Sequence, residues 1–244
     1  MCQKSTAIVL AFAALAIVPL IARAEMGPCI PDDHGSLTCG NGEGAARVIP
    51  KTRSPSSRLA LAWRLKSSAP GYQLHEGNPD LESVIVRIED GTILAKSRGT
   101  YWDMGDRYAK AQYLTAAWSP DSRLLIRMAG KGDEPHSAEL FAFAQDDGVT
   151  GPFDLVKVVD PAVRAEMKGI KDVDRYTFRI SHMPSMTIDD QGLIHASVFM
   201  EALDSGNERI YKLTAQVTRA ANSFDAKVLS ISQYLGPYIS VTVH

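Results

Sequence analysis

The chain has 244 residues, of which 45% are hydrophobic and 22% are charged, and its formal net charge is −2. This length and composition are typical of one good-sized domain with a hydrophobic core. Lysines and arginines are scattered singly along the chain, which argues against binding to nucleic acid or to an anionic membrane surface.

Residues 1–24 are predicted to be a cleaved signal peptide. Lys4 provides a basic start, Ala7–Ile21 is apolar, and residues 22–24 (Ala-Arg-Ala) have the small-residue spacing of a cleavage site. The apolar run is shorter than the roughly 20 residues that a membrane-spanning helix needs, although an uncleaved anchor helix is the alternative. We therefore expect a periplasmic or secreted protein, cleaved after Ala24, with no membrane span in the mature form.

Residues 25–47 are rich in Gly, Asp and Pro and are predicted to be an irregular N-terminal segment. Its two cysteines, Cys29 and Cys39, are expected to form a disulfide in an oxidising compartment. Residues 32–34 (Asp-Asp-His) lie between them, but a metal site there would lack the spaced second pair of ligands that zinc sites have. We favour a solvated polar loop over a metal site, and the sequence indicates no metal and no cofactor.

From residue 48 onward, apolar residues recur at every second position, which is the pattern of β-strands. In residues 83–97, two such runs flank Asp90 and Gly91, and this arrangement predicts a β-hairpin. Only Asp160–Asp172 has the composition of a helix. Residues 48–244 are therefore predicted to form a single, mainly antiparallel, all-β domain.

A short phrase that combines a turn and a strand occurs twice in this domain. Ser54–Arg58 (SPSSR) and Ser119–Arg123 (SPDSR) each carry a proline at the second position of a predicted turn, and each precedes an apolar strand. Met186–Met200 contains a looser third copy, in which Gly192 and Leu193 fall where Arg and Leu stand in the first two. Because the turn sets the register of the strand, six residues are expected to be buried at equivalent places: Leu59, Leu61, Trp63, Leu124, Ile126 and Met128.

The stretch from Trp118 to Ile126, WSPDSRLLI, resembles the turn phrase of the TolB-like periplasmic β-propeller repeats. In that family the phrase joins two strands of a blade and builds the scaffold. The resemblance implies a propeller-like stack of about three sheet units, near residues 48–112, 113–178 and 179–244. Closed propellers need roughly four to eight blades, so we expect an open or incomplete array, with a β-sandwich as the alternative.

The family has glycine where this chain has Ser57 and Ser122. A residue other than glycine at positive φ costs about 1 kcal/mol. The conformation of these two turns is therefore left open by the sequence.

Two loops carry the candidate functional residues. The segment around Tyr101, Trp102, Asp103 and Arg107 combines aromatic and charged side chains, which suits a ligand-binding surface and equally suits packing between sheets. A second, polar loop contains Asp133, Glu134 and His136, which could act as an acid–base cluster or serve only for solubility. His195 lies in an alternating strand and is expected to face solvent.

The sequence contains no nucleophile elbow, no glycine-rich phosphate loop and no metal-binding spacing of histidines. These observations favour an exported, non-enzymatic module that binds a protein, glycan or small ligand in the cell envelope. The alternative is a small envelope hydrolase or lyase that uses loop carboxylates and histidine. Convergence of Asp103, Asp133 and His136 in one pocket would favour that alternative.

Overall fold

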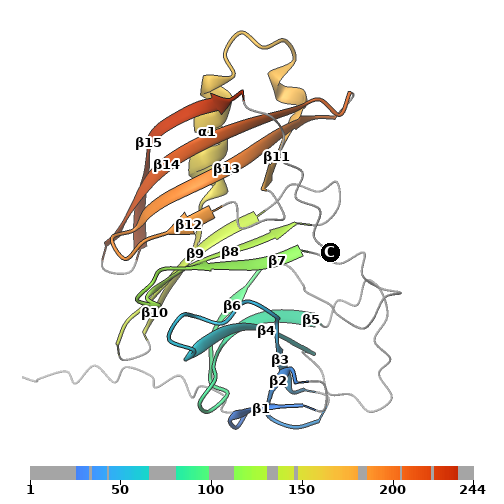
Figure 1. The fold of residues 1–244 in the computed structure, drawn as a ribbon, viewed down its shortest axis with the longest axis vertical. Helices are drawn as coiled ribbons and strands as arrows, with labels where there is room; N and C mark the ends of the chain where they lie inside the picture. The colour runs from blue at the N-terminus through green and yellow to red at the C-terminus, as the bar shows by residue number, and fades with distance from the viewer. Residues whose placement is uncertain are drawn as a thin grey trace, which may run out of the picture.

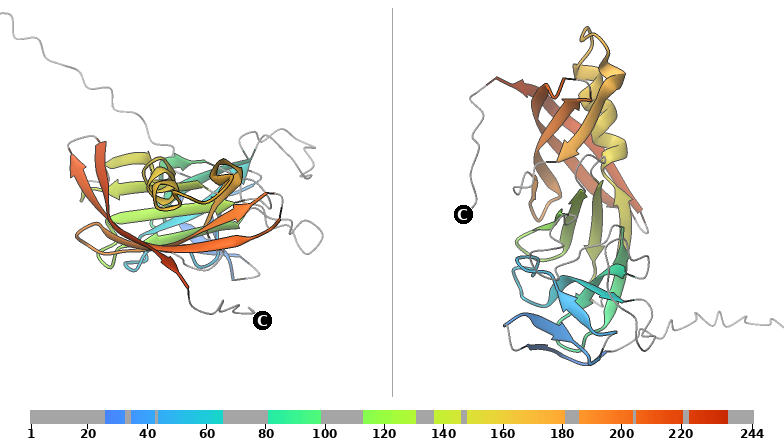
Figure 2. Two further views of the ribbon diagram at one scale, coloured as in Figure 1. Left: turned by 90° about the horizontal axis from the view of Figure 1, so that it is seen from above. Right: turned by 90° about the vertical axis from the view of Figure 1, so that its right-hand side faces the viewer.

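The computed structural model describes residues 26–32, 35–42, 44–65, 81–98, 113–130, 137–145, 148–180, 186–203, 205–220 and 223–235. These residues form three antiparallel β-sheets, which lie one above the other along the long axis of the molecule (Figures 1 and 2). Within the described residues, the two edge strands of each sheet are not paired with each other. The predicted all-β stack of three open sheet units is therefore confirmed.

The first sheet, sheet A, contains six strands that neighbour one another in chain order. They are β1 (Cys29–Pro31), β2 (Leu37–Cys39), β3 (Ala46–Val48), β4 (Leu59–Leu65), β5 (Leu81–Arg87) and β6 (Ile93–Ser97). The N-terminal segment was expected to be irregular, but it contributes β1 and β2 and continues the sheet through β3.

The middle sheet, sheet B, also follows chain order. Its strands are β7 (Tyr113–Trp118), β8 (Leu124–Gly130), β9 (Ser137–Phe143) and β10 (Val149–Asp154). Helix α1 (Val156–Glu166) and the short 3-10 helix η1 (Val173–Arg175) lead from it to the third sheet. The helix begins four residues before the predicted Asp160–Asp172 segment and contains Pro161 within it.

The third sheet, sheet C, has the longest strands. They are β11 (Tyr176–Ile180), β12 (Met186–Ile188), β13 (Leu193–Ala202), β14 (Glu208–Ala220) and β15 (Ser223–Tyr234). Strands β11 and β12 both pair with β13, and the sheet continues through β14 to β15. Helix α1 lies beside this sheet (Figure 1) and contributes Val159 and Val163 to the core that sheet C shares with sheet B.

The hydrophobic core occupies the spaces between the sheets because successive side chains of a strand point to opposite faces. Leu61 and Ile85 of sheet A pack against Leu125 and Phe141 of sheet B. On its other face, sheet B buries a second set of residues, including Ile126 and Leu140, against sheet C. Both faces of the middle sheet are therefore buried.

Of the six residues expected at equivalent places, five are buried and Leu124 is partly buried against the core between sheets B and C. The residues Leu59, Leu61 and Trp63 face sheet B. Ile126 and Met128 face sheet C. The two phrases thus direct their apolar residues toward the next sheet along the stack, as the repeat predicted.

The two ends of the stack are covered differently. On the outer face of sheet A, the small residues Ala60, Ala62 and Val84 are buried under the N-terminal segment, to which Cys39 belongs. The outer face of sheet C carries the exposed polar residues His195 and Lys212 beside the partly buried Phe199 and Ile210. A largely polar outer face is typical of the end of a stack of repeated sheets.

Candidate functional site

The two loops that carry the sequence-predicted functional residues lie outside the described residues. This applies to Tyr101, Trp102, Asp103 and Arg107, and equally to Asp133, Glu134 and His136. The roots of both loops are described. The first loop follows Arg98 directly, and the second joins Gly130 of β8 to Ser137 of β9.

The two copies of the turn phrase have the same hydrogen bonds. In each, the first serine donates its backbone N–H to the strand residue five positions later, from Ser54 to Leu59 at 2.8 Å and from Ser119 to Leu124 at 2.9 Å. The hydroxyl of the same serine accepts the N–H of that leucine, at 3.1 Å and 2.9 Å. The serine therefore closes the turn with both its backbone and its side chain.

The turns also share a residue in the left-handed region. Ser57 and Ser122 have φ angles of 58° and 65°, so serine adopts here a conformation that glycine adopts more easily. The third turn uses glycine, because Gly192 has a φ of 81°.

The third turn is one residue shorter than the others. Asp189 donates its N–H to Leu193, four positions later, at 3.1 Å. By backbone conformation, Gly192 therefore corresponds to Ser57 and Ser122 rather than to the arginine that follows them, which corrects the alignment expected from the sequence.

The three turns lie in line along the stack and are joined by hydrogen bonds between sheets. Ser56 donates its backbone N–H to the hydroxyl of Ser122 at 2.9 Å. Asp121, which holds the position of Ser56 in the second turn, donates its N–H to a carboxylate oxygen of Asp190 at 2.8 Å. We call residues 54–58, 119–123 and 189–192 the turn ladder.

A groove runs beside the turn ladder, across both sheet–sheet boundaries. A hollow of about 220 Å³ between sheets A and B and one of about 560 Å³ between sheets B and C share the five residues Asp121, Arg123, Phe143, Ala144 and Gln145. Buried Phe143 and Phe224 give the groove an apolar floor. We call it the turn-edge groove.

The turn-edge groove is lined by three arginines, one from each sheet unit, and by two aspartates. Arg58 and Arg123 occupy the same position in the first two turns. Arg219 of β14 lines the hollow between sheets B and C and donates to the Thr150 hydroxyl at 3.1 Å. The aspartates are hydrogen-bonded in the turn ladder, Asp121 to Ser119 and Arg123 of its own turn and Asp190 to the Asp121 N–H. Burial raises the pKa of Asp121, but the hydrogen bonds from Ser119 and Arg123 outweigh this effect and lower the pKa below its usual value.

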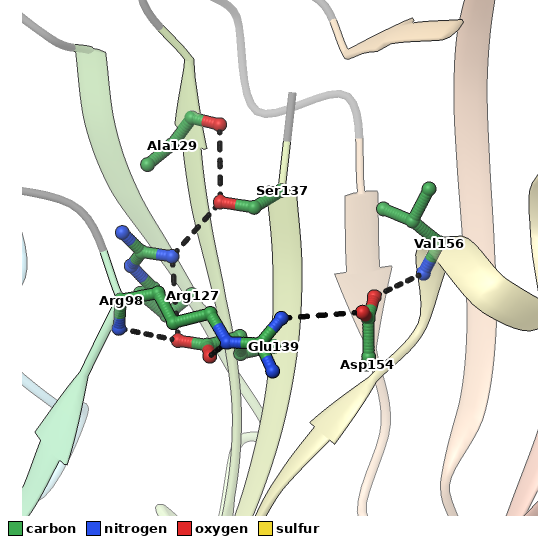
Figure 3. Close-up of polar contacts among 7 residues, drawn as sticks. All are labelled: Arg98, Arg127, Ala129, Ser137, Glu139, Asp154 and Val156. Carbon is green, nitrogen blue, oxygen red and sulfur yellow. Dashed lines mark hydrogen bonds and ion pairs between the residues drawn. The ribbon is translucent and has the colours of Figure 1, made fainter. Parts of the chain in front are cut away.

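A second candidate site is a cluster of charged residues at the roots of the two loops (Figure 3). Arg127 of β8 and Glu139 of β9 are directly opposite each other in the sheet, and both side chains are almost completely buried, with exposures of 0% and 1%. Their ion pair joins Arg127 Nη1 to Glu139 Oε2 at 3.3 Å, and Nη1 also donates to the Ser137 hydroxyl at 3.0 Å. We call Arg98, Arg127, Ser137, Glu139 and Asp154 the ion cluster.

Arg98 ties the ion cluster to sheet A. Its backbone N–H donates to Glu139 Oε2 at 2.9 Å. Its guanidinium lies 3.4 Å from Glu139 Oε1 and 3.4 Å from Asp154. Burial lowers the pKa of Arg127 to about 10, and the raising effect of Glu139 only partly offsets this. The cluster therefore holds a buried cation at a considerable desolvation cost.

Sequence reasoning missed both sites. Because Ile126 and Met128 were expected to be buried, strand alternation puts Arg127 on the opposite face, which would meet solvent in a sheet with one exposed face. One signal in the sequence could have indicated that this face is buried: Leu125, an apolar residue, lies on the same face as Arg127, and it is fully buried. The turn-edge groove had no local signal, because Phe143, Arg219 and Phe224 meet only when the sheets stack.

Cys29 and Cys39 lie opposite each other in β1 and β2 at disulfide-bonding distance. Within the described residues, no group of three or more His, Cys, Asp or Glu side chains is arranged to hold a metal ion. No helix in that part of the chain has the length and apolarity needed to cross a membrane. No family model, no curated protein and no solved structure matches this chain.

Proposed function

We propose that this protein is an exported, non-enzymatic binding module of the TolB-like repeat type, and that its ligand is an extended acidic peptide segment of a partner protein lying in the turn-edge groove. The observation that carries the proposal is the groove itself, which crosses both sheet boundaries and takes one arginine from each sheet unit. The export part rests on residues 1–24 and on the pairing of Cys29 with Cys39.

The chemistry of the groove favours a peptide. Its formal charge is +1, from three arginines and two aspartates, in a chain whose net charge is −2. Phe143 and Phe224 offer an apolar floor for alternate side chains of an extended segment, while the arginines at the rim meet its carboxylates. A groove of mixed apolar floor and polar rim is the usual form of such interfaces.

The test is fluorescence anisotropy with a labelled peptide of alternating glutamate and leucine. We expect the variant Arg58→Glu/Arg123→Glu to bind about tenfold more weakly or worse, since two charge-assisted contacts become repulsive. Arg53→Glu is the matched control, because Arg53 is exposed next to the first turn and does not line the groove. Its affinity should equal that of the unsubstituted protein.

Two results would contradict the proposal. Equal binding of a peptide of alternating lysine and leucine would show that the groove does not select for acidic ligands. Tight binding of oligogalacturonate together with none of the peptide would assign the groove to an acidic glycan instead.

A further inference from the structure

Several polar atoms are buried between sheets A and B with no hydrogen-bond partner in the described part of the chain. They are the hydroxyls of Ser83 and Ser97 and Nε and Nη2 of Arg127. Oε1 of Glu139 also accepts no hydrogen bond, but it forms an ion pair with Arg98 Nε at 3.4 Å. Buried polar groups in proteins nearly always have a partner, whether protein, water or ligand. Four atoms without any partner at one boundary need a common explanation.

These atoms come from facing strands of the two sheets. Ser83 and Ser97 are cross-strand partners on β5 and β6, and Ser83 lies on the same face of β5 as Ile85, which packs against sheet B. Arg127 and Glu139 are the corresponding partners on β8 and β9. Arg98, which follows Ser97 in the chain, donates its N–H to Glu139, so the serine pair and the ion pair adjoin each other.

The unpartnered atoms of Arg127 have the geometry of a carboxylate-binding edge. Its Nη1 is used by Glu139 and Ser137, and in Figure 3 the other nitrogens lie on the far side of the guanidinium from them. Nε and Nη2 present two parallel N–H groups, the arrangement that binds a carboxylate with two hydrogen bonds. A ligand carboxylate would satisfy both donors at once.

The charges of the ion cluster favour the same ligand. Glu139 is shared between Arg98 and Arg127, so the fully buried guanidinium lacks a counter-charge of its own. An anionic group on Arg127 would supply it. Arg98 is 64% exposed, so the cluster reaches the surface on that side.

We propose that this boundary is a binding site for a small carboxylate that also carries a hydrogen-bond donor, such as a short hydroxy or amino acid. The carboxylate is held by Nε and Nη2 of Arg127, with the Ser83 and Ser97 hydroxyls beside it. The donor of the ligand bonds to Oε1 of Glu139. The site is separate from the turn-edge groove and does not depend on the function proposed for it.

The probes are acetate, glycolate and acetamide, measured by thermal unfolding and by the side-chain Nε–H signal of Arg127 in 15N-arginine-labelled protein. We expect glycolate to raise the melting temperature saturably, acetate to do so more weakly and neutral acetamide not to do so. Glycolate should also shift the Arg127 Nε–H signal. Ser97→Ala should weaken glycolate binding about tenfold while leaving the unliganded protein at least as stable, because it removes an unpartnered hydroxyl.

Arg127→Met should abolish the effect of glycolate, and Arg64→Met is the matched control. Arg64 also pairs with a buried glutamate, Glu82, at 2.6 Å, but it lies outside the proposed site. If Arg127→Met does not fold, the Arg127 Nε–H signal of the unsubstituted protein and the glycolate affinity of Ser97→Ala still test the proposal. The proposal would be overturned if no probe shifted the Arg127 Nε–H signal. It would also be overturned if acetamide raised the melting temperature as much as glycolate.

Discussion

Ser57 and Ser122 occupy equivalent positions in the first and second turns, yet their side chains have different surroundings. Both residues adopt a positive φ, a conformation that costs a residue with a side chain about 1 kcal/mol relative to glycine. The hydroxyl of Ser122 accepts the N–H of Ser56 from the neighbouring sheet. Ser57 is exposed. The conformational cost is therefore offset by a contact in the second turn.

The pair gives a direct prediction. Ser57→Gly should raise the free energy of unfolding by about 0.5–1 kcal/mol, because it relieves the strained φ and loses little. Ser122→Gly should give no gain, because the same relief comes with loss of a hydrogen bond worth about 1 kcal/mol. Urea unfolding of the two variants measures the difference, and an equal gain in both would mean that the turn-ladder bond contributes nothing.

At the scale of single elements, the hairpin between β5 and β6 depends on one carboxylate. Asp90 accepts the Thr92 N–H at 3.0 Å and two hydrogen bonds from Arg87 Nε, at 2.9 Å and 3.0 Å. The hydrogen bonds from Arg87 hold the pKa of Asp90 well below its usual value, against the opposing effect of burial. Because the folded-state pKa is lowered, the stabilisation is present above the unfolded-state pKa of about 3.9 and is lost as the pH falls through the folded-state pKa.

We expect Asp90→Asn to lower the free energy of unfolding by about 1–2 kcal/mol at neutral pH, since charge-assisted hydrogen bonds become neutral ones. The difference from the unsubstituted protein should shrink as the pH falls from about 5 toward 2. Denaturant unfolding across this range measures it. A difference that stays constant with pH would show that the charge of Asp90 is irrelevant to the hairpin.

Such elements show what the sequence could and could not predict. The hairpin at Asp90 and Gly91 and the strand after each turn phrase followed from local patterns, because turn chemistry and the period of two are local properties. The burial of Arg127 could not be predicted, because the alternation of residues along a strand separates its two faces but does not show whether the second face meets solvent or another sheet. The candidate loops of the sequence, with Trp102 and His136, stay predictions, whereas the turn-edge groove depends on Arg219 and Phe224, which no local pattern connects to the turns.

At the scale of the whole molecule, the stack is held at one end by the N-terminal segment. Gly27 and Cys29 donate their N–H groups to the carbonyls of Asp90 and Ile88 at 3.1 Å and 2.9 Å, so the segment covers the outer face of sheet A. Pairing of Cys29 with Cys39 closes a loop with a sequence separation of 10 residues. The disulfide therefore fixes the cover over the small residues Ala60 and Ala62.

Intact mass should show that the native protein gains two hydrogens on reduction, and reduction should lower the free energy of unfolding by about 2–3 kcal/mol. Cys29→Ala/Cys39→Ala should lose a similar amount and no longer respond to reductant. Two free thiols in native material would rule out the bridge. Unchanged stability in the double variant would show that the cover does not need it.

The hydrogen bonds of the turn ladder allow the stack to contain a different number of sheet units. The middle turn receives the Ser56 N–H at Ser122 and passes its own Asp121 N–H upward, and Asp121 holds the same turn position as Ser56. The middle turn therefore has a donor on the side of sheet C, the Asp121 N–H, and an acceptor for such a donor on the side of sheet A, the Ser122 hydroxyl. A second copy of the middle unit could for this reason be inserted between the two end sheets. Each such insertion would lengthen the turn-edge groove by one arginine and one apolar residue, and the number of units would set the length of peptide that the proposed binding groove could hold.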